Sequence, residues 1–518
     1  MGAQGRIPGP LGLAYARHMA RPTRPSARLL ALVLPALLLV GCGDDAGPGV
    51  DGGPRVDGGP GIDGGPGIDA GPRPDAGPGT DAGTPPPMGW APLPWEDCEG
   101  SGRMLEAGPD DYRSVLDTLM PGDTLRLAPG MYARGLPVRV SGEPGRCIVI
   151  EGTPGEARPL ILGSDSFNLI SLRAVGWVKV RHIDLDGGGM AGFGVASEGG
   201  ESGWAHHIVV EDLHMVGFGG DQQIVGVSTK SPCWDWVIRG NTVLGAGTGL
   251  YLGNSDGTQP FIRGLVEFNV VLDTIGYNMQ IKHQVSRPAV TGIPTEPAET
   301  TVRYNVFSKE SGGSSGGSAR PNFLLGHFPT SGEGADDRYL VYGNFFHENP
   351  NENLVQAEGN VAFYANVLVN RAGGAAVFQP HNDVPRQIDV FLNTVLAAGR
   401  PIRVSGGDPA FSQRVFDNAI FADQPIAADT ATGNFEGSLA DAETMLANAT
   451  AAPGAGLDLH PTGGGLGGTV DLGSLGGFPN ASLDFDGRAR DGSVIGAYGG
   501  PASAESWPLA RSGRPWGP

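Results

Sequence analysis

A short pattern of apolar and polar positions recurs along the second half of the chain. It consists of an aliphatic residue, two variable residues, an asparagine, one variable residue and an apolar residue, as in IRGNTV and VRYNVF. Short apolar segments bounded by Gly, Asn and Asp are typical of β-strands and turns. The copies follow one another at intervals of 22 to 39 residues. The asparagines of the seven copies are Asn241, Asn269, Asn305, Asn344, Asn366, Asn393 and Asn418.

A unit of this length cannot bury its own apolar face, so successive units are expected to stack on one another. Two earlier segments, VRHIDL and VEDLHM, keep the pattern with Ile183 and Leu213 in the asparagine position. The sequence therefore predicts an all-β solenoid. An asparagine at one recurrent place can bind turn backbone and the asparagine of the next coil, which identifies the seven as a structural ladder.

Two further segments carry a resemblance to a known superfamily. PGDTLRLAPGMY runs from Pro121 to Tyr132 behind a short helical segment around residues 112–119, and SLDFDGRARDGSVIGAYGG ends at Gly500. With the repeats, they resemble the right-handed parallel β-helix superfamily, which includes pectate-lyase-like and chondroitinase-B-like proteins. The resemblance covers roughly residues 105–500. It implies a single-stranded right-handed parallel β-helix with a short N-terminal capping helix.

The N-terminus has the features of an export signal. Residues 29–40 read LLALVLPALLLV, an apolar run of 12 behind several arginines, which is too short to span a bilayer and fits a signal peptide better than a buried strand. The run ends in Leu39-Val40-Gly41-Cys42, which resembles a bacterial lipobox. The resemblance implies a signal peptide over residues 1–41, lipidation of Cys42 and export to the cell envelope. The lipid is then expected to be the only attachment to a membrane.

The next segment lacks the residues needed for a folded core. An aspartate recurs every sixth residue from Asp45 to Asp81, with Gly and Pro filling most of the positions between. A hexapeptide-repeat β-helix would keep an aliphatic residue in every repeat, and here the aliphatic position changes to Pro74 and Thr80. We therefore expect a disordered tether over residues 42–88 and a β-helix domain over residues 89–518.

Composition and charge narrow the choice of partners. The 87 Gly and 44 Pro among 518 residues, with only 17% charged residues, disfavour a helical bundle. A net charge of −20 removes the attraction on which nucleic-acid binding depends. Nothing indicates oligomerisation, so a monomer is expected. Among the three cysteines after Cys42, a disulfide between Cys98 and Cys147 is favoured over the pairings with Cys233.

Stacking suggests where a functional site lies. Each asparagine motif is followed by a second strand, and alignment on the buried residues puts Leu250, Met279, Phe323, Leu354 and Val377 at one level. Adjacent coils lie about 4.8 Å apart, so the residues four positions further on are expected to form a polar column. These residues are Asn254, His283, His327, Glu358 and His381.

The column and its neighbours offer groups for β-elimination on a uronate. Such a reaction needs a base, a group that neutralises the carboxylate and an acid for the leaving oxygen. Lys282 is predicted as the base, His283 or His327 as the proton donor, and Arg320 as the partner of the carboxylate. The predicted substrate contacts are Asn254, Gln280, Glu358 and His381. The expected partner is a polysaccharide, and the loops 285–301 and 311–318 are expected to wall the groove.

The resemblance to chondroitinase B and related alginate lyases implies a lysine base, an arginine and a calcium site with two acidic residues. In GYNMQIKHQ the lysine matches Lys282, but Ile275 and Tyr277 stand near the places of the acidic pair, and the strand FLLGH offers His327 and no arginine. The cofactor therefore stays open, with calcium as the one that the resemblance implies. Three alternatives remain: a transition-metal site, a glycoside hydrolase using Glu358 with Asp383, and a non-catalytic glycan-binding or matrix-binding lipoprotein.

Overall fold

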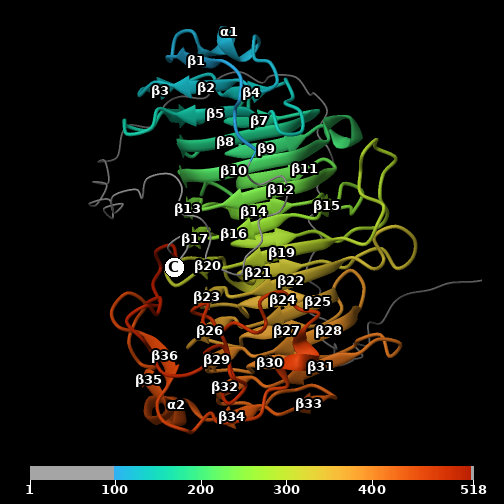
Figure 1. Cartoon of the computed structure of the whole chain (residues 1–518), viewed down its shortest axis with the longest axis vertical. Helices are drawn as coiled ribbons and strands as arrows, with labels where there is room; N and C mark the ends of the chain where they lie inside the picture. The colour runs from blue at the N-terminus through green and yellow to red at the C-terminus, as the bar shows by residue number, and fades with distance from the viewer. Residues whose placement is uncertain (1–97, 515–518) are drawn as a thin grey trace, which may run out of the picture. The chain divides into compact units, whose positions relative to one another are not determined.

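The computed structural model describes residues 98–514, and its strands repeat in three faces around each coil (Figure 1). The first face lies before the asparagine corner, the second face lies after it, and a ten-stranded sheet forms the third face. Pairing between neighbouring coils is parallel on all three faces. The prediction of an all-β, right-handed parallel β-helix is confirmed.

The bounds of the strands follow the faces. The first face consists of β1 (Met104–Ala107), β2 (Thr124–Leu127), β5 (Ile148–Gly152), β12 (Cys233–Arg239), β15 (Phe261–Ile262), β16 (Leu265–Glu267), β19 (Glu299–Arg303), β22 (Arg338–Tyr342), β25 (Gly359–Tyr364), β28 (Pro385–Phe391), β31 (Gln413–Phe416) and β33 (Ala431–Thr432). The second face consists of β3 (Met131–Tyr132), β6 (Leu160–Leu162), β13 (Thr242–Leu244), β17 (Val270–Leu272), β20 (Val306–Ser308), β23 (Phe345–His347), β26 (Val367–Asn370), β29 (Thr394–Ala397), β32 (Ala419–Ala422) and β34 (Phe435–Gly437). Two long strands, β8 (Val175–Asp186) and β10 (Ala205–Val216), run through the corner and join these faces into one sheet of 24 strands.

The third face carries the shorter strands on which the candidate site is built. It consists of β4 (Leu136–Val138), β7 (Ile170–Leu172), β9 (Val195–Glu198), β11 (Val225–Lys230), β14 (Thr248–Leu252), β18 (Met279–Ile281), β21 (Phe323–Leu325), β24 (Val355–Ala357), β27 (Ala376–Phe378) and β30 (Ile402–Val404). Along these strands, alternate residues point into the core and out of the stack, as the period of two requires.

The asparagine corner explains the recurrent motif. Asn305 is buried, and its Nδ2 donates to Asn344 Oδ1 over 2.9 Å while its Oδ1 accepts from Asn269 Nδ2 over 2.9 Å. The residue before each asparagine turns the chain with a positive φ, for example 58° at Tyr304. Asparagine therefore supplies the donor and acceptor that the turn backbone lacks. The ladder runs through the seven predicted asparagines and one more rung, Asn434, which accepts from Asn418 Nδ2 over 2.8 Å.

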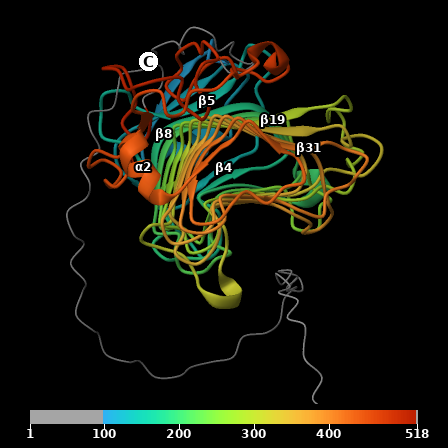
Figure 2. The same cartoon turned by 90° about the horizontal axis from the view of Figure 1, so that it is seen from below.

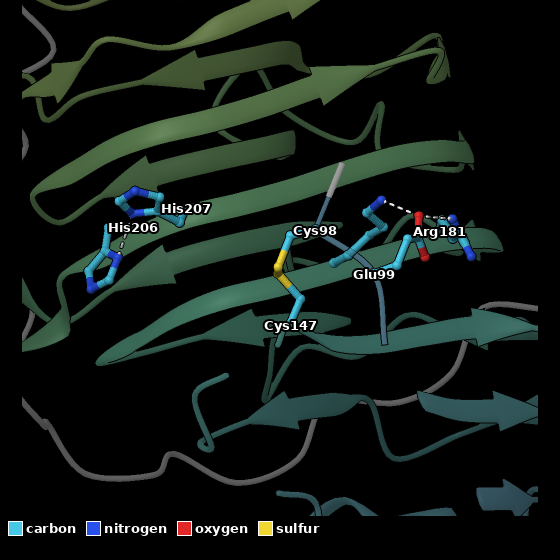
Figure 3. The surroundings of a disulfide bond; sticks show 7 residues. Cys98, Glu99, Cys147, Arg181, His206 and His207 are labelled. Carbon is cyan, nitrogen blue, oxygen red and sulfur yellow. Dashed lines mark hydrogen bonds and ion pairs between the residues drawn. A yellow bond between two sulfur atoms is a disulfide. The ribbon is translucent and has the colours of Figure 1, made fainter. Parts of the chain in front are cut away.

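The N-terminal end of the stack is fastened covalently and by charge. Helix α1 (Tyr112–Leu116) lies beside β1 at this end (Figure 1). A disulfide joins Cys98 to Cys147, the pair that the sequence favours (Figure 3). Beside it, Glu99 Oε1 accepts from Lys179 Nζ over 2.6 Å and from Arg181 over 2.9 Å. Cys233 is a buried free thiol.

Residues 438–514 leave the stack and pack along the outside of the asparagine corner. This tail contains α2 (Leu439–Met445) and the antiparallel pair β35 (Leu446–Asn448) and β36 (Asp458–Pro461). Its aromatic residues Phe485 and Trp507 join one apolar cluster with Tyr304 and Phe391 of the corner. Three short 3-10 segments complete the regular structure: Gly200–Gly203, Gly316–Ser318 and Leu472–Leu475.

The predicted signal peptide, Cys42 and the tether lie outside the described residues. Within residues 98–514, neither α-helix has the length and apolar character that crossing a membrane requires.

Candidate functional site

The edge between the third and the first face carries the centre of the predicted site. Lys282 and His283 directly follow β18, and His327 follows β21 on the next coil. The ladder continues past the strand, because the N–H of Lys282 donates to the carbonyl of Leu252 over 2.8 Å. The rings of His283 and His327 stack with centroids 5.2 Å apart, and His327 Nδ1 donates to the carbonyl of Phe328 over 2.7 Å. The structure thus brings these two imidazoles together on adjacent coils.

The register of the third face differs from the predicted alignment in its last two coils. The sequence placed Leu354 and Val377 at this level, whereas strand pairing places their neighbours Val355 and Ala376 there. Both Leu354 and Val355 are fully buried, so the apolar pattern does not distinguish which one faces the interior. A slip of one residue turns a side chain to the other face of the sheet. The observed level consists of Leu250, Met279, Phe323, Val355 and Ala376.

Glu358 therefore lies in the column of Lys282 and is not an exposed rung beside His283. Its side chain is fully buried, and no carboxylate oxygen is left for a substrate. The predictions of Glu358 as a substrate contact, and of Glu358 with Asp383 as a hydrolytic pair, are wrong for this reason. Its oxygens accept from four backbone N–H groups, those of His327 (3.3 Å), His381 (2.9 Å), Asn382 (3.0 Å) and Asp383 (3.0 Å). Glu358 is a positioning residue that holds the loops of two coils.

The electrostatics of the edge keep His283 uncharged at neutral pH. Burial, followed by the charges of His327, Lys282 and His381, lowers the pKa of His283 to about 4. His381 lies outside the predicted register, yet the loop between β27 and β28 brings it close enough to act on His283. The site is a cluster of basic side chains in which the imidazole of His283 is held neutral and able to accept a proton.

A second lysine, which the sequence analysis missed, joins this cluster. Lys230 ends β11, and its Nζ lies 5.2 Å from the ring centroid of Tyr251, while Lys282 Nζ lies 5.4 Å from the same centroid. Burial lowers the pKa of Lys230, and the charge of Glu198 offsets part of the effect. Continuing the sequence alignment one coil toward the N-terminus places Lys230 beside Gly253, so the signal was present.

Arg320 does not belong to this edge. It precedes β21, whereas His327 follows it, so the two residues lie at opposite ends of the strand. The guanidinium of Arg320 donates to the carbonyls of Gly317 and Ala319. Its predicted role here is wrong, and the loop 311–318 lies at that other edge and does not wall the site.

Two predicted contacts lie near the cluster in different surroundings. Asn254 is half-buried in the turn after β14, where its Oδ1 accepts from the N–H of Ser255 over 3.0 Å. Gln280 points outward from the middle of β18 between Tyr251 and Leu324. It is 3% exposed, and its Oε1 has no hydrogen-bond partner among the described residues. An orphaned buried acceptor is costly, and the burial of Oε1 leaves it no surface for a substrate.

The loop predicted over residues 285–301 ends where β19 begins at Glu299, and it is anchored firmly. Arg287 of this loop forms a buried ion pair with Asp337, which ends the loop that carries His327. Near these loops, a cleft of about 220 Å³ is lined by Thr295, Pro297, Gly332, Glu333, Gly334 and Asp336. Figure 2 shows the yellow loops of these coils projecting from the stack near β19. The two loops are thus fixed relative to each other.

An aromatic cluster holds the other side of that loop. His206 is stacked between Trp204, at 5.3 Å, and Trp234, at 4.8 Å, and its Nδ1 lies 2.9 Å from Nδ1 of His207 (Figure 3). Burial, with a smaller effect of the His207 charge, lowers the pKa of His206 to about 4. Trp234 packs with Ala298 and, from the loop, with Val290 and Ile293. Both histidines lie in β10 and support the loop.

A group resembling a serine–histidine–aspartate triad lies in the tail. Ser506 Oγ is 3.2 Å from His460 Nε2, and His460 Nδ1 is 2.6 Å from Asp458. However, Asp486 also accepts from Nε2 over 2.8 Å. Burial lowers the pKa of His460, but the hydrogen bonds and charges of Asp486 and Asp458 outweigh burial and raise it. A doubly bound imidazolium has no free base, so this group fastens the tail.

The calcium that the resemblance implies does not fit these residues. Calcium needs six to eight oxygen ligands, largely carboxylate and carbonyl groups. Near Lys282 the carboxylate of Glu358 is consumed by backbone N–H groups. Within residues 98–514, no three His, Cys, Asp or Glu side chains gather as ligands, which also disfavours the transition-metal alternative.

No protein-family model matches the chain, and none of the curated proteins matches its sequence. Solved structures with a similar course of the chain include a GH136 lacto-N-biosidase from Eubacterium ramulus, at 12% identity and a TM-score of 0.42, covering 65% of this chain and 68% of that one. They also include the PL6 family alginate lyase AlyGC, at 14% identity and a TM-score of 0.42, covering 64% of this chain. The match spans about half of that lyase, 51% of its length. The pectate lyase Pel9A is 13% identical with a TM-score of 0.39, covering 78% of this chain and 98% of that one.

Proposed function

We propose that this chain is a polysaccharide lyase that cleaves a uronic-acid-containing glycan by β-elimination at the edge carrying Lys282, His283 and His327. The observation that carries the proposal is the neutral imidazole of His283 next to Lys282 and stacked on His327. A neutral imidazole accepts protons, and a neighbouring ammonium group can pair with the carboxylate that acidifies the proton α to it.

In the proposed reaction, Lys282 pairs with the uronate carboxylate and His283 takes the α-proton. The C–O bond to the leaving sugar breaks as the C=C bond forms, and His283 returns its proton to the leaving oxygen. The bound carboxylate opposes the positive charges around His283 and raises its pKa toward neutrality. The base therefore gains strength when substrate is present.

These roles differ from those predicted from the sequence, in which Lys282 is the base and His283 or His327 the acid. His327 gives its Nδ1–H to the carbonyl of Phe328, so in its neutral form Nε2 has no proton to donate. With Arg320 at the other edge, the pairing with the carboxylate passes to Lys282, which precedes His283. His381 and Asn254 remain proposed as substrate contacts at the rim.

The test uses purified protein and a panel of uronic-acid polymers, with and without calcium, and follows ultraviolet absorbance of unsaturated ends. Wild type is expected to act without calcium on at least one polymer. His283→Asn should lower kcat by roughly 10²- to 10⁴-fold, as expected for loss of a general base. His214→Asn, an imidazole 38% exposed on β10, is the matched control and should keep full activity.

Lys282→Arg separates the two possible roles of the lysine. If Lys282 only neutralises the carboxylate, an arginine should retain much of the rate, because guanidinium pairs well with carboxylates. If Lys282 is the base, Lys282→Arg should be as inactive as Lys282→Ala. If the protein binds a glycan but cleaves none of the polymers, the non-catalytic glycan-binding alternative is favoured.

The cellular setting is also proposed. The lipobox-like Leu39-Val40-Gly41-Cys42 supports a lipid anchor in the cell envelope, at the outer membrane or cell surface, and the chain is proposed to act as a monomer. Cys42→Ser should lose acyl labelling and leave the membrane fraction. Labelling that persists in this variant would contradict the anchor.

A further inference from the structure

Two lysines face each other across a gap on the third face. Lys230, Gly253 and Lys282 occupy one column on three successive coils, because β11, β14 and β18 are paired in register up to the preceding residues. Gly253 has a φ of +86°, and a Cβ there would lie 3.4 Å from the Cβ of Lys282. The glycine therefore adds no side chain of its own between the stems of the two lysines, whose ammonium groups share the Tyr251 ring, and Lys230 Nζ also lies 4.9 Å from the centroid of Phe193.

The outward column beside this gap is polar and incompletely satisfied. Ser228, Tyr251 and Gln280 follow one another on the same three coils. Both lysine Nζ atoms lie over the Tyr251 ring, from the coil before and the coil after it. Ser228 Oγ and Gln280 Oε1 are buried and have no hydrogen-bond partner among the described residues. The two ammonium groups, which are half-buried, are thus the parts of this strip that reach the surface, while Ser228 and Gln280 lie beneath it.

We propose that Lys230 and Lys282 form a two-point clamp for an acidic glycan that lies along the axis of the stack. Lys282 binds the carboxylate of the sugar that is cleaved, and Lys230 binds an acid group further toward the N-terminal end. The lysines are two coils apart, which is about 10 Å along the axis and a distance that a disaccharide unit spans. The substrate class is therefore a polymer with an acid group in every disaccharide, and this inference rests on the proposed function.

The clamp accounts for polyanion binding by an acidic protein. The chain carries a net charge of −20 and only four lysines, and two of the four lie in this column. A general negative field repels uronates, so binding requires cations concentrated at one place. Both lysines are half-buried, and the charge of a partly buried group is screened less by salt than that of an exposed one.

The test measures how Lys230→Ala changes turnover and binding of glycans of increasing length. On a polymer, Lys230→Ala should raise KM about tenfold with kcat within about twofold of wild type, and Lys230→Arg should restore most of the loss. On the shortest cleavable oligosaccharide with a single acid group, Lys230→Ala should match wild type. Arg403→Ala removes a cation from the same outward face, four strands away on β30, and should leave both substrates unaffected.

Binding distinguishes failure of the clamp from failure of the lyase. Titration of His283→Asn with the same oligosaccharides gives affinities without turnover, and Lys230→Ala in that background should weaken only the longer ones, about tenfold. Equal effects of Lys230→Ala and Arg403→Ala, or equal effects on short and long glycans, would overturn the clamp while leaving the lyase intact. Length-dependent binding without turnover by wild type would overturn the lyase and retain the clamp.

Discussion

Glu358→Gln is expected to loosen both loops of the candidate site while leaving the stack folded. The carboxylate accepts from the N–H groups of His327, His381, Asn382 and Asp383 at 2.9 to 3.3 Å, and its side chain is fully buried. A glutamine keeps one acceptor oxygen and turns an NH₂ group toward backbone donors. At least one bond is lost, and each remaining bond loses its charge assistance, about 1 kcal/mol apiece. The expected loss in the free energy that holds the two loops in place is roughly 3–5 kcal/mol.

Hydrogen exchange of the amides at residues 381–383 measures this directly, with urea unfolding as the global readout. The three amides should exchange faster in Glu358→Gln, because opening of a solenoid loop is local. Asp383→Asn is the matched control, since Asp383 Oδ1 accepts only the N–H of Val384, over 2.8 Å. A change below about 0.5 kcal/mol with unaltered exchange in Glu358→Gln would refute the positioning role.

Three further perturbations test other parts of the molecule. Asn305→Ala removes three donated bonds of 2.9 Å and should lower the free energy of unfolding in urea by roughly 3 kcal/mol. Asn434 is a half-buried end rung with one donated bond, so Asn434→Ala should lower it by about 1 kcal/mol. Equal losses in the two variants would contradict the ladder. Replacing Cys98 and Cys147 by serine removes a disulfide between residues 49 apart and should lower the free energy of unfolding by up to about 4 kcal/mol. A wild-type protein whose stability does not change when a reductant is added would speak against the disulfide. The pKa of His460 is raised in the folded protein, so the protonated imidazole stabilises the fold. This stabilisation is complete below the pKa of the unfolded chain, near 6.5, and is lost as the pH rises through the pKa of the folded protein. Proteolysis of the tail should therefore accelerate on raising the pH, and His460→Gln should abolish this dependence.

The fold was readable from the sequence because an asparagine makes the same corner contacts on successive coils from Asn241 to Asn418. The asparagine motif remains recognisable although the interval between copies varies from 22 to 39 residues. Asn434 escaped because it follows Asn418 by only 16 residues and because Glu436 stands where the pattern has an apolar residue. The last coil is short and partly exposed, so its strand needs no apolar side chain there.

The site was readable only in part. His283 and His327 were found because strand pairing on their coils matches the predicted alignment, with Met279 beside Leu250 and Phe323 beside Met279. The register failed at Leu354 and Val355, where two adjacent buried residues make the inward position ambiguous. Glu358 can be buried because backbone N–H groups 23 to 31 residues away in the sequence bind its carboxylate. A local sequence pattern around Glu358 does not show that these donors come close to it.

The most direct measurement of the central claim is an NMR titration of the His283 imidazole in the free protein and with a uronic-acid oligosaccharide bound. We expect a pKa of about 4 in the free protein and a rise toward neutrality when the carboxylate binds. An imidazole that titrates near its ordinary value of about 6.5 and does not respond to the oligosaccharide would contradict the account.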